Sequence, residues 1–242
     1  MSDNIQPRGS DDNTLVQPLL TPIKRRSFFM YAGATAGATA LVLAGCSKDS
    51  VTPSPSAISL GSGDVGVLNY AYALEQLEAA FYAQIVKTPA ADFKTGELAL
   101  FTEIAAHEGI HRDFFKAAIN RDAPGKILQN LTPDFSSVDF TKRDSVLGTS
   151  KAFEDLGVAA YNGAGKLLKT AAYLVIAGQI VSVEARHAAY VRDLLDTTGK
   201  SFAGDDQVDP TTGLDKAMMP VDVIAAAQMY IKEKLDASSV GK

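Results

Sequence analysis

The sequence of 242 residues contains a single cysteine, Cys46. A lone cysteine cannot form a disulfide within the chain, and it excludes a zinc site built from several cysteines. Cys46 also lies in a processing signal, described below. We therefore expect no cysteine in the folded region to act as a nucleophile.

Histidine is almost as scarce, and the three histidines fall in two similar motifs. These are Glu108-Gly-Ile-His111, with His107 beside it, and Glu184-Ala-Arg-His187. Residues three apart share one face of a helix, so each Glu-x-x-His motif offers a carboxylate and an imidazole side by side. Such a pair suits a metal ion that accepts oxygen and nitrogen ligands.

Residues 1–45 have the features of an export signal. Lys24-Arg25-Arg26-Ser27-Phe28-Phe29 precedes a Gly/Ala-rich apolar run that closes with Leu43-Ala44-Gly45-Cys46. The twin arginine resembles a Tat signal, and the last four residues resemble the cleavage box of bacterial lipoproteins. We expect cleavage before Cys46 and lipidation there, which would anchor the protein in the cell envelope, on the periplasmic side or the outer surface. The alternative is an uncleaved transmembrane helix of about 18 apolar residues.

The chain beyond this signal is acidic. Residues 1–45 hold four of the 23 basic and three of the 28 acidic residues, so cleavage leaves 19 against 25, a net charge of −6. No basic patch remains, and we expect no nucleic-acid partner. Residues 46–63 are rich in Ser, Pro and Gly. They are predicted to be a flexible tether of about 60 Å when extended.

Helical periodicity begins at about Asp64, and no strand pattern of any length competes with it. Helices are predicted over residues 65–87, 95–120, 144–169 and 171–198, with an irregular crossover at 121–143. A loop at 200–219 leads to a short amphipathic helix over 221–235. Two helix pairs joined by one long crossover predict an all-α four-helix bundle over residues 64–199, followed by the loop and a C-terminal helix over 200–242.

The two helix pairs form an internal repeat. The segment from Leu74 to Tyr82 aligns with the segment from Phe153 to Tyr161. This alignment pairs Glu75 with Glu154, and the two Glu-x-x-His motifs also correspond. The repeat predicts six inward-facing ligands, one Glu from each of two helices and a Glu-x-x-His from each of the others: Glu75, Glu108, His111, Glu154, Glu184 and His187. Four buried free carboxylates would be costly, and two divalent cations would cancel their charge.

With these motifs the chain resembles the ferritin-like superfamily of di-iron and di-manganese proteins, and most closely its exported bacterial members, with relatives linked to desiccation and stress. The resemblance covers about residues 64–198. It implies that Glu108 and Glu184 bridge two metal ions, and that Glu75 and Glu154 are terminal ligands. It also implies that His111 and His187 each complete one metal. Tyr82 and Tyr161 match a tyrosine near the metals of ferritins, and their hydroxyls could bond a ligand carboxylate.

Some positions depart from family patterns. The lack of a second cysteine excludes a rubredoxin-type electron-transfer domain. Gly109 stands where haem-binding bacterioferritins have Met, so we expect no haem. His107 is expected to lie behind the ligands or to face solvent. Glu78 aligns with Gly157 and has no counterpart, so it is either a spare ligand or a polar flank.

The resemblance implies two iron ions, with manganese as the alternative, and O2 or peroxide as the substrate of a ferroxidase or peroxide-removing enzyme in stress protection. A dimanganese catalase is a second enzyme hypothesis, and a metal-binding or structural envelope protein without turnover is a third. The sequence leaves the oligomeric state open, and a homo-oligomer is one option. His107-Glu108-Gly-Ile-His111 also matches the zinc metalloprotease signature. That interpretation leaves the second motif and the repeat unexplained.

Overall fold

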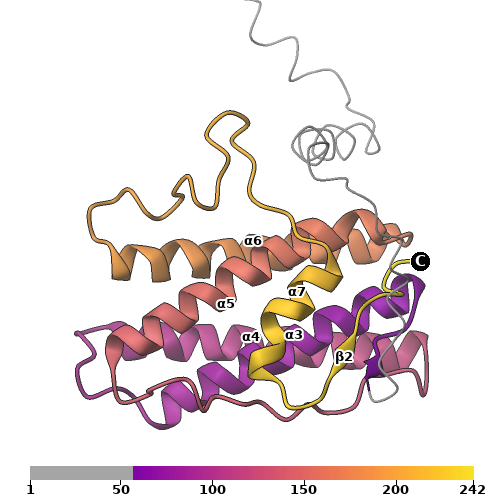
Figure 1. Cartoon of the computed structure of the whole chain (residues 1–242), viewed down its shortest axis with the longest axis horizontal. Coiled ribbons are helices and arrows are strands. Elements are labelled where there is room, and N and C mark those ends of the chain that lie inside the picture. The colour runs from indigo at the N-terminus through magenta and orange to yellow at the C-terminus, as the bar shows by residue number, and fades with distance from the viewer. Residues whose placement is uncertain (1–56) are drawn as a thin grey trace, which may run out of the picture. The chain divides into compact units, whose positions relative to one another are not determined.

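Four long helices make up most of residues 57–242, the part of the chain that the computed structural model describes (Figure 1). They are α3 (Gly63–Lys87), α4 (Glu97–Asp122), α5 (Arg143–Ala164) and α6 (Ala171–Leu195). Helix α3 packs along α4, α5 packs along α6, and α3 also contacts α5. The predicted all-α four-helix bundle is therefore confirmed. The predicted signal segment, Cys46 and the first part of the tether lie outside the described residues.

The connection between α4 and α5 crosses the bundle without forming a helix, as predicted. It contributes to the core through its aromatic side chains, because the rings of Phe135 and Phe140 each lie 5.6 Å from the ring of Phe81 on α3. Its main chain is fixed by Asn69, whose side chain accepts a hydrogen bond from the Leu128 N–H and donates one to the Lys126 carbonyl, each at 2.8 Å. The long link is thus held against the helices.

The third and fourth helices end earlier than predicted. Helix α5 stops at Ala164 and continues as a 3₁₀ turn, Gly165–Leu167, rather than reaching Lys169. The carboxylate of Asp64 accepts hydrogen bonds from the N–H groups of Lys169 and Thr170, at 2.8 and 2.9 Å. In a continued helix these two N–H groups would bond carbonyls four residues earlier in the chain. Their bonds to Asp64 of α3 instead hold the chain in the turn that leads into α6. Helix α6 ends at Leu195, three residues before the predicted end.

The C-terminal helix is also shorter than the predicted 221–235. It comprises α7 (Pro220–Ala227) and a 3₁₀ turn, Gln228–Tyr230. The amide of Gln228 then bonds the backbone of three following residues, Ile231, Glu233 and Leu235. These bonds hold the chain in a form that does not continue the helix.

The segment after α7 pairs with the chain just before α3. Strand β1 (Ile58–Ser59) lies parallel to β2 (Leu235–Asp236), with Ile58 opposite Leu235. The next residue, Leu60, is fully buried and its N–H donates to the Asp236 carbonyl at 3.0 Å. Residues 57–62, predicted to belong to the tether, are therefore part of the folded unit.

Two buried arginines join neighbouring segments of the bundle. Arg143 at the start of α5 donates to Glu97 at the start of α4, at 2.6 Å. Arg192 on α6 is 2% exposed and bonds Asp155 on α5 and Asp206 in the loop after α6. Both cations are paired with carboxylates, which is the condition for burying a charge at tolerable cost. Within residues 57–242, no helix combines the length and apolar character that a membrane span requires.

A substitution at Gly163 of α5 tests whether the segment before α7 packs against this helix. The Met218 N–H donates to the Ala159 carbonyl at 2.9 Å, and a Cβ on Gly163 would lie 1.7 Å from the Met218 oxygen. We expect Gly163→Ala to lower the free energy of unfolding by about 1–3 kcal/mol, as overpacking does. Urea denaturation of the metal-free protein measures this change.

Gly178→Ala is the matched control, because Gly178 is exposed in the middle of α6 and a Cβ there meets nothing within 4 Å. It should raise the free energy of unfolding by about 0.5–1 kcal/mol. Equal effects of the two substitutions would contradict the close approach of Met218 to α5.

Candidate metal centre

All six predicted ligands meet inside the bundle. They form two groups, each with one potential ligand atom per residue and all of these atoms within 4.8 Å of one another. One group contains Glu75, Glu108, His111 and Glu184, and the other contains Glu108, Glu154, Glu184 and His187. Glu108 and Glu184 belong to both groups, so they lie between two adjacent subsites. The four glutamates are at most 1% exposed.

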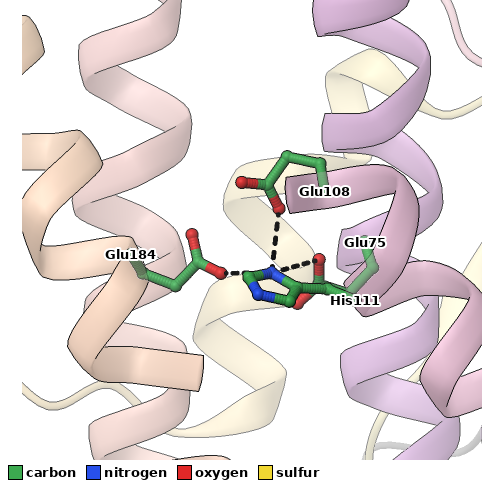
Figure 2. Close-up of side chains that lie close together, drawn as sticks. All are labelled: Glu75, Glu108, His111 and Glu184. Atoms are coloured by element: carbon green, nitrogen blue, oxygen red, sulfur yellow. Dashed lines mark ion pairs between the residues drawn. The ribbon is translucent and has the colours of Figure 1, made fainter. Parts of the chain in front are cut away.

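In the first subsite the carboxylates surround one nitrogen of His111 (Figure 2). Its Nδ1 lies 2.9 Å from Oε1 of Glu184, 3.4 Å from Oε2 of Glu108 and 3.6 Å from Oε2 of Glu75. Glu75 comes from α3, Glu184 from α6, and the other two residues from α4. Three helices therefore converge on one point.

The second subsite repeats this arrangement around His187 of α6. Its Nδ1 lies 3.0 Å from Oε1 of Glu108 and 3.5 Å from Oε2 of both Glu154 and Glu184. Glu108 and Glu184 thus present one oxygen to each histidine. This is the geometry of a carboxylate that bridges two cations.

The buried ligand atoms fit a metal because they lack other partners. Within the described residues, no hydrogen bond reaches Nδ1 of either histidine, either oxygen of Glu108 and Glu184, or Oε2 of Glu75 and Glu154. The contacts of about 3 Å are close but not aligned as hydrogen bonds, and cis ligands about 2.1 Å from one cation would have such separations. Leaving these atoms unpaired would be costly, and divalent cations would satisfy them.

The electrostatics show what balances the charge when no cation is bound. Burial raises the pKa of Glu75 well above its usual value and raises the pKa of Glu154 to about 8. Burial would also raise the pKa of Glu108, but the imidazoles of His111 and His187 hold it below its usual value. Burial lowers the pKa of both histidines, yet the surrounding carboxylates raise each to about 12. Protons therefore occupy the metal-free site at neutral pH.

Two tyrosines hold the outer carboxylates from opposite halves of the repeat. The hydroxyl of Tyr82 donates to Oε1 of Glu154 at 2.5 Å, and the hydroxyl of Tyr161 donates to Oε1 of Glu75. Burial, followed by the charge of the bonded glutamate, raises the pKa of both hydroxyls, so they remain donors. The expected contact with a ligand carboxylate is confirmed. It leaves Oε2 of each glutamate to face the subsite.

His107 lies outside both ligand groups, as expected. It is exposed on α4, and its Nδ1 is 2.9 Å from Nε2 of His187, the nitrogen remote from the carboxylates. The metalloprotease hypothesis needs His107 and His111 on one metal. The structure instead places His107 of α4 next to His187 of α6, on the side of that imidazole that faces away from the carboxylates.

Glu78 is the carboxylate whose role the sequence left open. It is only 5% exposed, and within the described residues its side chain has no hydrogen bond or ion pair. Burial and then the charges of the four ligand glutamates raise its pKa well above the usual value. A Cβ on Gly157 would lie 3.2 Å from Oε1 of Glu78, so this glycine leaves room for the carboxylate. The repeat aligns Glu78 with Gly157, and this mismatch is the feature of the sequence that points to their contact.

The raised pKa of His111 and His187 predicts that metal affinity depends on pH. A metal ion must displace the protons on these imidazoles, and raising the pH makes their removal less costly. We expect the apparent affinity for Mn²⁺ to rise with pH, by about tenfold per pH unit for each proton released. Calorimetric titration in buffers of different ionisation heat, near pH 6.5 and pH 7.5, measures both quantities. A pH-independent affinity without proton release would contradict the assignment.

Comparison with known proteins agrees with this geometry. No curated protein matches the sequence. The model of a family described as the ferritin-like domain matches residues 63–197, which is more than half of the chain and spans all four bundle helices. The chain therefore belongs to the ferritin-like domain family.

Proposed function

We propose that this protein binds two iron ions and uses them to reduce O2 or peroxide, as an envelope-anchored ferroxidase or peroxide-removing enzyme in stress protection. The observation that carries the proposal is the sharing of Glu108 and Glu184 between two subsites. A mononuclear site would need no such pair of bridging carboxylates. The proposal favours iron, and the same set of oxygen and nitrogen ligands would suit manganese.

The two metal ions would supply the electrons, two of which with two protons convert one H2O2 into two water molecules. The protein's own groups would hold the centre together while its charge changes. Glu108 and Glu184 would keep one oxygen on each side, and the two tyrosine hydroxyls would keep the outer carboxylates in place. Their raised pKa favours hydrogen-bond donation over loss of the proton.

A small apolar cavity beside the centre supports a small substrate. It has a volume of about 20 Å³ and is lined by side chains of α3, α4, α5 and α6, including Phe114, Phe115 and Tyr161. A space of this size holds about one water-sized molecule. It reaches Tyr161, which contacts Glu75. Its small size and apolar lining suit O2 better than a bulky organic substrate.

The metal content and the peroxide reaction test the proposal together. Protein loaded in the cytoplasm should contain about two Fe per chain. Two ferrous ions supply the electrons for one H2O2, so the protein should consume peroxide over many turnovers only when a reductant returns the iron to the ferrous state. Glu184→Gln should lose both properties because it removes a shared oxygen ligand. Glu103→Gln, at an exposed position of α4, is the control and should behave like the wild type.

The other outcomes select the alternatives. Two Mn per chain with peroxide consumption in the absence of reductant would favour a dimanganese catalase. One Zn per chain would favour the metalloprotease hypothesis. No metal would favour a structural envelope protein, and full metal occupancy in Glu184→Gln would contradict the shared ligand.

Anchoring at the envelope is supported by the twin arginine at Arg25-Arg26 and the box ending at Cys46. Several acyl chains on one cysteine would hold the protein stably on a membrane. We expect mass spectrometry of the membrane fraction to find a wild-type chain that begins at Cys46 and carries acyl chains, whereas Cys46→Ser should keep residues 1–45 and carry none. A wild-type chain that retains residues 1–45 would contradict lipidation and favour a transmembrane helix.

A further inference from the structure

The contact of His107 with His187 makes the two halves of the centre unequal. The Nδ1 of His107 lies 2.9 Å from Nε2 of His187, across the gap between α4 and α6. Their rings are nearly parallel, at 8°, with centroids 5.2 Å apart. His107 is exposed at its position, whereas His187 is 6% exposed.

The position of this bond decides which nitrogen of His187 can bind a metal. Nδ1 of His187 faces Glu108, Glu154 and Glu184, and Nε2 faces His107. A neutral imidazole has an N–H on one nitrogen and a lone pair on the other. The hydrogen-bond partner of the N–H fixes which nitrogen carries the proton. If Nε2 donates to Nδ1 of His107, the lone pair of His187 points at the carboxylates, where a cation would sit.

The other half of the repeat lacks such a partner. The position equivalent to His107 is Val183, which precedes Glu184 and cannot accept a hydrogen bond. Within the described residues, Nε2 of His111 has no hydrogen-bond partner, while its Nδ1 faces the carboxylates as that of His187 does. The six ligands are therefore symmetric, but the support behind the two histidines is not.

We propose that His107 is a positioning residue that makes the subsite of Glu154 and His187 the tighter of the two, so that it fills first. This proposal rests on the proposed dinuclear site. His107 would act by holding His187 in the tautomer and orientation that present Nδ1. The subsite of Glu75 and His111 would fill second, because within the described residues no side chain behind its imidazole fixes the tautomer that presents Nδ1.

Stepwise titration with Co²⁺, followed by its visible absorption, tests the proposal. The wild type should bind two ions in two steps of different affinity, and His111→Ala should abolish only the weaker step. His107→Ala should weaken the first step by about 10–100-fold, as the loss of a partner behind a metal-bound histidine does, and leave the second unchanged. His107→Asn should restore most of the loss, because its side-chain oxygen can accept the same hydrogen bond.

A spectroscopic measurement separates positioning from a general structural role. In zinc-loaded protein labelled with ¹⁵N, the Nε2–H of His187 should be visible and slow to exchange in the wild type and in His107→Asn. It should exchange rapidly in His107→Ala, while the circular dichroism stays the same.

The outcomes distinguish this proposal from the dinuclear site itself. Two steps that are unchanged in His107→Ala would overturn the positioning role and leave the dinuclear site standing. Two ions that bind the wild type with equal affinity would also overturn the role of His107 and leave the dinuclear site standing. A wild type that binds no metal would overturn both.

Discussion

The burial of negative charge governs the rest of this structure. Four glutamates lie inside a bundle of about 135 residues with at most 1% exposure. A carboxylate in such an environment must be protonated, paired with a cation or bound to a metal. The imidazoles at about 3 Å supply positive charge to these carboxylates, and the hydroxyls of Tyr82 and Tyr161 supply hydrogen bonds. The apolar side chains around them make the requirement strict, since little water can reach the centre to solvate the charges.

The repeat explains the symmetry of the ligands, and its departures show where the two halves differ. Each tyrosine holds the glutamate of the other half, so the two pairs of helices are joined through the centre as well as through their apolar contacts. Glu78 faces Gly157, and His107 corresponds to Val183. Both extra polar groups come from α3 and α4, so the first half carries more of the polar network than the second.

The helices and the convergence of the six Glu and His side chains could be predicted because both depend on local periodicity. An inward stripe with Glu75 on it fixes which way the carboxylate points, and the repeat supplies its partner in α5. The C-terminal segment could not be predicted in the same way. The bonds of Gln228 to the backbone and the pairing of β2 with β1 depend on residues far along the chain. The contact of His107 was also out of reach, because the phase of α4 and the placement of α6 together decide whether the two rings meet.

The pairing of β1 with β2 has a consequence for the order in which the protein can fold. Ile58 pairs with Leu235, which lies 177 positions further along the chain. The entry to α3 is therefore closed by a segment that the ribosome makes after all four helices. Closing so long a loop early would cost chain entropy, so the helix hairpins can form first while the strand pair completes the fold last. A nascent chain would therefore carry the four helices without this strand pair until its last residues leave the ribosome.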